Sequence, residues 1–322
     1  MGRPARQTHQ LGRQLKLRQL EVLLAVAQWG SMARAAEHLA ITQPVVSKTI
    51  ADLEHIVGVR LLDRTSHGVE PTLYGRSLLK RSAALFNDVR ASISELEFLA
   101  DPSSGELRLG TSEPMTAGLL CAIVDRLSQQ HPRISFHVKL GDPLQLQDRE
   151  LRERGIDLII GRLPAQIPAA DDIEVEALLE EQAFVVAGSQ NPLTRRRKLK
   201  LTDLTNERWA LPPLESYPGS LINQAFRACN LGYPRNGVTA HSNQMQTALL
   251  ATGRFLTILP GTMLLFSAER LQIKILPVNL AIPPWPIGIV TLKNRMLSPV
   301  AQLFIDCARA VAKASLKSGQ PG

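Results

Sequence analysis

A stretch of residues 31–53, SMARAAEHLAITQPVVSKTIADL, constrains the fold of this chain more than any other. Apolar residues recur at spacings of 4, 3 and 4 in its second half and just beyond it, at Val46, Ile50, Leu53 and Val57. This spacing puts them on one face of a helix, since an α-helix turns once in about 3.6 residues. A shorter helix is predicted before it, whose Ala35 and Ala36 are small enough to let the two helices approach closely. The segment therefore predicts two helices joined by a tight turn.

Capping residues indicate where the two helices begin. Ser31 is predicted to cap the first helix, because a serine hydroxyl accepts a free first-turn N–H. Thr42 is predicted to cap the second helix in the same way, and Pro44 fits its first turn, where a missing N–H costs no hydrogen bond. Ala40 and Ile41 form the predicted turn. This arrangement is typical of a helix-turn-helix, whose second helix enters the major groove of duplex DNA.

The other face of the second helix carries residues that suit base recognition, namely Gln43, Pro44, Ser47, Lys48 and Ala51. Glutamine pairs with adenine through two hydrogen bonds, serine and lysine bond base edges or phosphates, and proline and alanine contact thymine methyl groups. The alternative is an ordinary amphipathic hairpin with a solvated polar face, which periodicity alone does not exclude. The caps, the small packing residues and the uncharged polar groups together favour the DNA interpretation.

The flanking segments extend this unit. Upstream, a helix that ends at residues 29–30 is predicted from an apolar stripe at i, i+3, i+4 and i+7, which consists of Leu20, Leu23, Leu24 and Ala27. Downstream, two short runs around a glycine-containing turn over residues 58–72 predict a two-stranded wing. Arg60, Arg64 and His67 are candidates there to contact phosphates or a minor groove.

Residues of this unit also match the pattern of a known family. They are Leu20, Ala35, Ala36, Leu39, Thr42, Gln43, Pro44, Ser47, Ile50, Leu53, Glu54, Gly58, Val59, Leu61, Leu62, Arg64, Leu73 and Gly75. With them, residues 17–76 resemble the N-terminal winged helix-turn-helix of LysR-type transcriptional regulators. The resemblance implies that Gln43, Pro44, Ser47 and Lys48 contact DNA from the reading helix and that Arg64 contacts it from the wing. Thr42 stands where many members have serine, and Lys48 where arginine is frequent; lysine keeps the charge but lacks the planar fork that binds guanine in two places.

Charge and composition agree with a DNA-binding protein without singling one out. The chain has a net charge of +8 and a pI near 9.7, which suit a polyanionic partner. Residues 1–14 are polar and basic without an apolar run, so they are predicted to be a disordered arm and not a signal peptide. No run of about 20 apolar residues occurs, so no membrane span is expected. The three widely separated cysteines fit a reducing cytoplasm, which is the expected location.

A long helix is predicted from residue 72 to residue 100. Its apolar residues step by 3, 4, 3 and 4 and are Phe86, Val89, Ile93, Leu96 and Ala100. This is the seam of a helix that pairs with another helix, and the alternative is a helix that docks on its own domain. Pairing is favoured, because a helix leaving a compact unit otherwise exposes the stripe to water. In the resembled family this helix makes the dimer, so we expect a homodimer or a homotetramer.

The rest of the chain alternates predicted strands and helices. A first unit consists of strands 107–111, 134–140 and 157–161 with helices 115–130 and 144–154, which implies a parallel doubly wound sheet. A second unit consists of strands 184–187, 208–211 and 255–259 with helices 220–229 and 244–253. Strands 273–276 and 287–291 are expected to return to the first unit, before a last helix over 299–313. Two such lobes joined by two crossings resemble a periplasmic-binding-protein fold, the effector domain of LysR-type regulators.

The predicted organisation is therefore a basic arm (1–14), a winged helix-turn-helix (15–75), a linker and dimerisation helix (76–100), a hinge (101–105) and a two-lobed effector-binding domain (106–322). The fold class is α/β with an all-α winged helix-turn-helix at the N-terminus.

An effector site is expected beyond the carboxyl ends of the strands, where open α/β sheets bind ligands, and at helix starts, which offer free N–H groups. The candidate residues are Thr111, Ser112, Asp142, Arg162, Ser220 and Ser242. Asp142 replaces a hydroxyl residue frequent in the family; its carboxylate would repel an acid and accept bonds from sugar hydroxyls or an amine. Arg162 binds a carboxylate or faces solvent. For the three serines, a plain capping role is the alternative.

Two functions fit this sequence. The first is a ligand-responsive regulator that binds an interrupted dyad-symmetric operator as a dimer or tetramer and contacts DNA, a small-molecule effector and RNA polymerase. The second is a small-molecule binding protein or transferase whose N-terminal helices serve assembly only. No phosphate-binding loop, metalloprotease motif or nucleophile elbow occurs, so we expect no enzyme, no catalytic residue, no cofactor and no metal.

Overall fold

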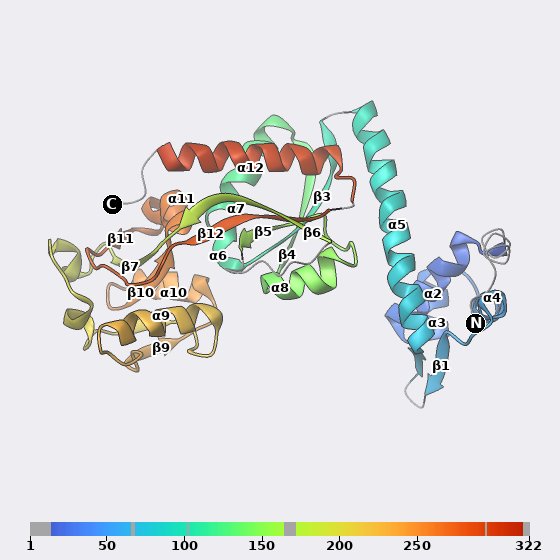
Figure 1. Cartoon of the computed structure of the whole chain (residues 1–322), viewed down its shortest axis with the longest axis horizontal. Helices are drawn as coiled ribbons and strands as arrows, with labels where there is room; N and C mark the ends of the chain where they lie inside the picture. Colours follow the sequence, from blue (N-terminus) through green and yellow to red (C-terminus); the bar gives the residue numbers. More distant parts are fainter. Residues whose placement is uncertain (1–13, 66–67, 102, 164–171, 294, 318–322) are drawn as a thin grey trace. The chain divides into compact units, whose positions relative to one another are not determined.

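The computed structural model describes residues 14–65, 68–101, 103–163, 172–293 and 295–317 (Figure 1). Except for residue 14, the predicted basic arm lies outside the described residues. The chain divides into two compact units, Met1–Ser92 and Ile93–Gly322.

The first unit is a helical bundle with a two-stranded wing. Its elements are α2 (Leu17–Trp29), α3 (Met32–His38), α4 (Gln43–Val57), β1 (Leu62–Thr65), β2 (Gly68–Pro71) and the start of α5 (Leu73–Ala100). The predicted helix-turn-helix, wing and long helix are thus confirmed. Val46, Ile50 and Leu53 are buried in its core, as the spacing predicts, and Val57 packs against them. Ala40 has a left-handed φ of 52°, which makes the turn between α3 and α4 tight.

Two local expectations for this unit need correction. Thr42 occupies the N-cap position of α4, but its hydroxyl makes no capping hydrogen bond; its carbonyl accepts the N–H groups of Val45 and Val46 instead. Ser31 does cap α3, accepting the N–H of Arg34 at 3.5 Å. The buried face of α2 is also broader than the predicted stripe. It comprises Leu20, Val22, Leu23, Ala25 and Val26, whereas Leu24 and Ala27 are half-buried, because α2 packs against both α3 and α4.

Helix α5 carries a row of exposed apolar side chains. The fractional exposure rises along the row from 39% at Val89 to 50% at Ile93 and 67% at Leu96. Phe86, the first residue of the predicted seam, packs against the core of the first unit instead. The exposed part of the seam therefore begins at Val89.

The second unit contains two lobes, each built on a five-stranded sheet. In lobe one the strand order is β4-β3-β5-β12-β6. The strands are β3 (Ser104–Thr111), β4 (Arg133–Leu140), β5 (Leu158–Arg162), β6 (Ile173–Glu181) and β12 (Trp285–Leu292). Strands β4, β3 and β5 run parallel, whereas β12 is antiparallel to both β5 and β6. The sheet is therefore mixed, whereas sequence analysis predicts a parallel sheet.

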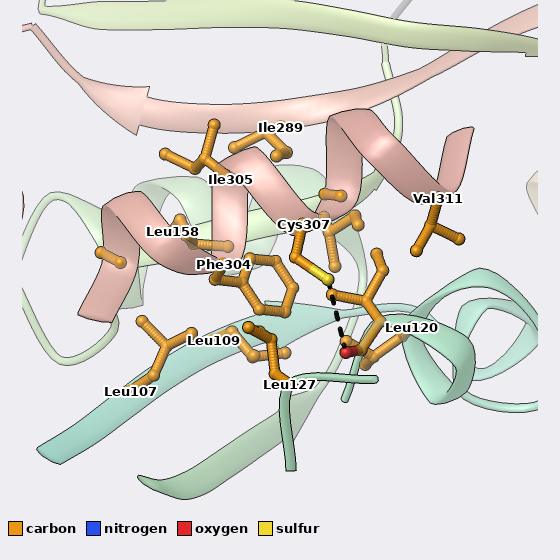
Figure 2. Close-up of a cluster of buried hydrophobic side chains, with 14 of the residues drawn as sticks. Leu107, Leu109, Leu120, Leu127, Leu158, Ile289, Phe304, Ile305, Cys307 and Val311 are labelled. Atoms are coloured by element: carbon orange, nitrogen blue, oxygen red, sulfur yellow. Dashed lines mark hydrogen bonds between the residues drawn. The ribbon is translucent and has the colours of Figure 1, made fainter. Parts of the chain in front are cut away.

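Helices α7 (Leu119–Gln130) and α12 (Pro299–Lys317) cover the core of lobe one (Figure 2). Figure 2 shows Phe304 and Cys307 of α12 among the leucines of β3 and α7. Phe304, Leu107 and Leu109 are all fully buried. Removing each such side chain from water contributes about 1.5–3 kcal/mol, so this contact holds the C-terminal helix to the sheet.

Lobe two has the strand order β11-β7-β10-β8-β9. The strands are β7 (Ala183–Gly188), β8 (Trp209–Leu211), β9 (Gly237–Thr239), β10 (Leu256–Pro260) and β11 (Ile273–Ile275). The helices are α9 (Tyr217–Ala228), α10 (Asn243–Leu250) and α11 (Gly261–Leu271). The chain crosses from lobe one at Gln182, between β6 and β7, and returns between β11 and β12.

Several predicted elements of this unit differ from the observed ones. The helix predicted over 115–130 is two helices, α6 (Glu113–Thr116) and α7, with Gly118 between them at a point where a Cβ atom would meet the backbone oxygen of Thr262 at 2.9 Å. The helix predicted over 144–154 is a short α8 (Pro143–Gln145) followed by a π-helical turn, Leu146–Leu151. Strand 273–276 pairs with β7 in lobe two and does not return to lobe one. Strands β6 and β9 and helix α11 were not predicted.

No helix among the described residues combines the length and the apolar character that crossing a membrane requires. Within the same residues, no three histidine, cysteine or acidic side chains come together in a way that would hold a metal ion.

Candidate functional site: a helix face and an inter-lobe cavity

The outer face of α4 presents the residues that sequence analysis singles out for DNA. Gln43, Pro44, Lys48 and Ala51 are exposed, and Ser47 is half-buried. Their neighbours Val46, Ile50 and Leu53 are buried on the opposite side of the same helix. Sequence analysis missed Val45, which is 42% exposed and adds apolar surface beside the polar groups. A rigid helix face with short donors, acceptors and methyl groups is the kind of surface that reads base edges in a major groove.

Glu54 joins this helix to the wing. Its Oε1 accepts the backbone N–H groups of Leu61 at 2.7 Å and of Leu62 at 3.2 Å, where β1 begins. The carboxylate therefore satisfies two donors and fixes where the wing starts relative to α4. Arg64 lies on β1, but its side chain is outside what the structure describes, as is the whole of His67. Arg60 is exposed just before the wing.

The second candidate site is a cavity of about 300 Å³ between the two lobes of the second unit. Lobe one contributes Ser112, Glu113, Asp142, Arg162 and Trp285, and lobe two contributes Pro212, Tyr217, His241, Asn243 and Gln246. Apolar side chains, among them Met115, Leu221 and Ile287, form much of the remaining wall. Three of the six predicted effector residues, Ser112, Asp142 and Arg162, thus line one cavity.

The other three predicted effector residues lie elsewhere. Thr111 is fully buried, and its hydroxyl donates to the carbonyl of Ile160 at 2.7 Å, which holds β3 to β5. Ser220 is exposed inside α9, whose actual cap is Ser216. Ser242 caps α10 by accepting the N–H of Met245 at 3.3 Å, so it follows the plain capping alternative. Neither Thr111 nor Ser220 is among the residues that line this cavity.

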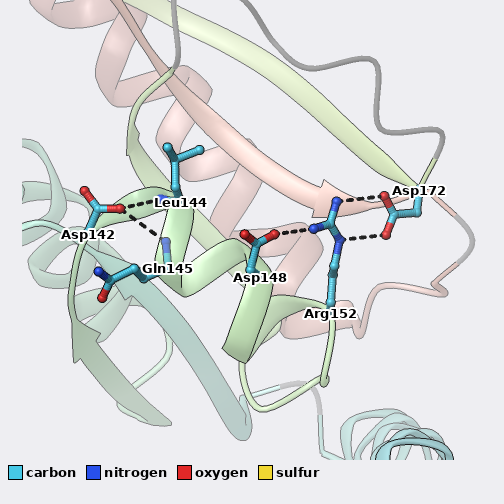
Figure 3. A network of polar contacts seen from close by, with 6 residues as sticks. All are labelled: Asp142, Leu144, Gln145, Asp148, Arg152 and Asp172. Atoms are coloured by element: carbon cyan, nitrogen blue, oxygen red, sulfur yellow. Dashed lines mark hydrogen bonds and ion pairs between the residues drawn. The ribbon is translucent and has the colours of Figure 1, made fainter. Parts of the chain in front are cut away.

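Asp142 lines the cavity and also caps a helix. Its Oδ1 accepts the N–H groups of Leu144 at 3.0 Å and of Gln145 at 3.2 Å, as Figure 3 shows. Ser112 stands at the N-cap position of α6 without a capping bond from its hydroxyl, so that hydroxyl remains available to the cavity. Figure 3 also shows Arg152 between Asp148 and Asp172. This contact pins the start of β6 to the π-helical turn.

Glu113 lines the cavity and connects the two lobes, a role that sequence analysis missed. It belongs to α6 of lobe one, and its Oε1 accepts the Ser242 hydroxyl at 3.2 Å and the Gln244 N–H at 3.3 Å. Both donors belong to the start of α10 in lobe two. The carboxylate therefore occupies a position where the partial positive charge of a helix N-terminus favours an anion.

Arg162 at the end of β5 is the centre of an aromatic and acidic group. Its guanidinium carbon lies 4.1 Å from the centre of the Trp285 ring and 4.5 Å from that of the Tyr217 ring, distances typical of cation–π contacts. Trp285 Nε1 donates at 3.0 Å to Glu181, a carboxylate that is only 3% exposed and also accepts the N–H and the hydroxyl of Thr262. Burial raises the pKa of Glu181 and lowers the pKa of Arg162, since both lose solvation of their charge.

Two family descriptions match the sequence. Residues 17–76 match the bacterial regulatory helix-turn-helix proteins of the lysR family, and residues 100–313 match the LysR substrate binding domain. The transcriptional regulator GbpR of Azospirillum brasilense is 29% identical over 303 residues, which cover 94% of this chain and 88% of GbpR. GalR of Pseudomonas putida is 27% identical over 294 residues, which cover 91% of this chain and 73% of GalR. These relatives are transcriptional regulators.

Solved structures share the fold. Full-length CbnR, crystallised with its target DNA, has a TM-score of 0.64 at 21% identity and covers 92% of this chain and 100% of its own. ArgP of Mycobacterium tuberculosis has a TM-score of 0.65 at 21% identity and covers 93% of this chain and 98% of its own. The predicted fold class, a winged helix-turn-helix followed by a two-lobed α/β effector part, is confirmed.

Proposed function

This chain belongs to the LysR family of bacterial transcriptional regulators, and we propose which of its surfaces carry out each part of that function. As a member it is a DNA-binding, ligand-responsive regulator that acts as a homo-oligomer. We propose that residues 15–75 read DNA, that residues 76–100 pair two copies, and that residues 106–322 bind the effector. The protein has no enzymatic activity in this proposal and works in the cytoplasm, where its DNA is.

The DNA-reading residues we propose are Gln43, Pro44, Ser47 and Lys48 on α4, with Thr42 before the helix and Arg64 on the wing. The observation that carries this assignment is the contrast between the two faces of α4. Val46 is fully buried. The side chains of Gln43 and Lys48 are exposed and have no hydrogen-bond or ion-pair partner in the described part of the chain. Lys48 adds a phosphate or base contact whose strength falls with added salt.

The exposed stripe on α5 supports pairing with a second copy. Val89, Ile93 and Leu96 form a connected apolar surface that a second α5 would cover. Two reading helices held this way contact two half-sites of an interrupted dyad-symmetric operator, and their binding energies combine. We also propose RNA polymerase as a further partner of the protein.

We propose that the inter-lobe cavity is the effector site, with Ser112, Asp142 and Arg162 as its contacts, and with Ser242 acting through Glu113. A ligand held by both lobes changes their relative arrangement only as far as it binds one arrangement more tightly than the other. That difference in affinity is the energy available to re-space the reading helices on DNA.

The test of the DNA surface is a comparison of three alanine variants of the full chain. Gln43→Ala and Ser47→Ala remove a candidate base contact, while Gln28→Ala removes an exposed glutamine at the end of α2. Fluorescence anisotropy measures binding to DNA from upstream of the protein's own gene and to a random duplex of equal length. We expect Gln43→Ala and Ser47→Ala to weaken specific binding by about 1–3 kcal/mol and non-specific binding far less, with Gln28→Ala unchanged. An equal loss on both duplexes would rule out base reading by these residues.

A further inference from the structure

The hydrogen bonds around the inter-lobe cavity engage its acidic side chains but not its arginine. Its three carboxylates already receive donors from the protein itself. Glu181 accepts from Thr262 and Trp285, Glu113 accepts from Ser242 and Gln244, and Asp142 accepts two N–H groups of α8. The acids of this cavity therefore have protein partners before any ligand arrives.

Arg162 is in the opposite situation. Of the arginines and lysines in the described chain, it alone lines the cavity, and within that same part no hydrogen bond or ion pair engages its guanidinium. The guanidinium carbon lies over the Tyr217 and Trp285 rings, and these cation–π contacts take up none of the conventional hydrogen bonds that its five N–H donors can make. The ring contacts thus hold the guanidinium in place without using its donors. A half-buried arginine with free donors needs an acceptor from outside the protein.

We propose that the effector is a small monocarboxylate, whose oxygens accept hydrogen bonds from Arg162 and whose apolar body fills the rest of the cavity. The inference rests on the proposed function, since it takes this cavity as the effector site. One guanidinium edge matches the two oxygens of one carboxylate and balances its single charge, whereas a phosphate carries up to two charges near neutral pH and Arg162 is the one lysine or arginine among the described residues that line the cavity. The volume of about 300 Å³ equals the share of about ten water molecules in the liquid, which limits the ligand to a small metabolite.

The negative charges nearby do not remove this preference. Glu113 lies at the start of α10, where the partial positive charge of the helix offsets part of its charge, and Asp142 is stabilised by the two N–H groups that it accepts. Glu181 faces Thr262 and Trp285 and forms no ion pair with Arg162 within the described residues. It acts as a positioning residue, because its bond to Trp285 keeps the indole ring against the guanidinium.

The experiment uses the full chain and pairs of probes that differ in charge but hardly in shape. Phenylacetate is compared with phenylacetamide, and cyclohexanecarboxylate with cyclohexanecarboxamide. Tryptophan fluorescence reports binding, and a Trp285→Phe variant identifies the part of the signal that comes from the cavity. We expect saturable binding of both carboxylates with Kd values in the millimolar range, about −4 kcal/mol, and binding of each amide at least about tenfold weaker.

Three variants assign the effect to the arginine. Arg162→Gln should weaken carboxylate binding by about 10- to 100-fold and leave amide binding within about threefold, as expected for loss of a charge-assisted hydrogen bond. Arg162→Lys should fall in between, because it keeps the charge without the fork. Arg208→Gln is the matched control, since Arg208 also lies over an aromatic ring, that of Phe255, but does not line the cavity. It should bind every probe as the unmodified chain does.

The failures of the two proposals are distinguishable. Equal binding of acids and amides, or carboxylate binding that survives Arg162→Gln, overturns the monocarboxylate inference and leaves the cavity as the effector site. If neither kind of probe changes the Trp285 signal, the cavity is not a small-molecule site and both proposals about it fail. Binding of the amides alone would point to a neutral effector that meets the acids and not the arginine.

Discussion

The contact between Glu113 and the start of α10 allows a quantitative test of how the two lobes are held together. Glu113→Gln removes the charge but keeps an acceptor oxygen, and Ser242→Ala removes one of the two donors. Hydrogen bonds to a charged group contribute about 1.5–3 kcal/mol when buried. Both distances, 3.2 Å from the hydroxyl and 3.3 Å from the N–H, are slightly longer than usual for such bonds, and the carboxylate is partly exposed, so solvent screens it. We therefore expect a coupling energy of about 0.5–1 kcal/mol between the two positions.

A double-mutant cycle measures this coupling. The free energy of unfolding in urea is obtained for the unmodified chain, Glu113→Gln, Ser242→Ala and the double variant. Tryptophan fluorescence follows the transition, because Trp209 and Trp285 both lie in the second unit. Each single variant should lower stability by about 0.5–1.5 kcal/mol, and the double variant should lose less than their sum.

A control cycle pairs Glu113→Gln with Thr252→Ala, which lies beyond the opposite end of α10 and bonds only to the Leu249 carbonyl among the described residues. This pair should be additive within about 0.3 kcal/mol. If the Glu113 and Ser242 pair is equally additive, the cross-lobe hydrogen bond does not help to hold the two lobes together. The role assigned to Glu113 would then be wrong.

Two further predictions concern the α5 stripe and the buried acid. Val89→Asp combined with Leu96→Asp should convert the dimer to monomers in analytical ultracentrifugation, with Ser92→Asp as the control; an unchanged dimer would refute the stripe as the pairing surface. Burial raises the pKa of Glu181 above 4.5, so the folded state holds its proton more tightly and the stability contributed by the protonated form is lost as the pH rises through the raised value. The stability of the unmodified chain relative to Glu181→Gln should therefore fall as the pH rises above 4.5, and a constant difference would contradict the raised pKa.

The sequence predicts the helix-turn-helix well because its determinants are local. The spacing of Val46, Ile50 and Leu53 depends only on the helical repeat, and all three are buried as predicted. The errors in this unit arise where another element intervenes. The buried face of α2 widens to Val22 and Val26 because two helices pack on it. A single apolar stripe predicts contact with only one helix.

The second unit shows how tertiary contacts override a local pattern. Residues 115–130 carry a helical pattern, yet the helix is interrupted at Gly118, where the backbone of Thr262 in lobe two leaves no room for a Cβ atom. The alternation of strands and helices predicts parallel pairing, but β12 arrives from the other lobe and joins β5 antiparallel. In both cases the partner segment lies far along the chain, so sequence spacing finds the elements and misses the breaks and directions.

For the candidate cavity too, the sequence indicates where single side chains lie but not what they bond to. Strand ends and helix starts lead from the sequence to Ser112, Asp142 and Arg162, which line one cavity, because topology alone places those positions at one edge. What each group does there depends on partners far along the chain. Glu181 bonds Trp285 across 104 residues, and Glu113 bonds Ser242 across 129. Since each of these pairings satisfies a carboxylate inside the protein, they leave the donors of Arg162 as the unmatched group, and the preference for an acidic ligand follows from contacts between residues that no sequence motif joins.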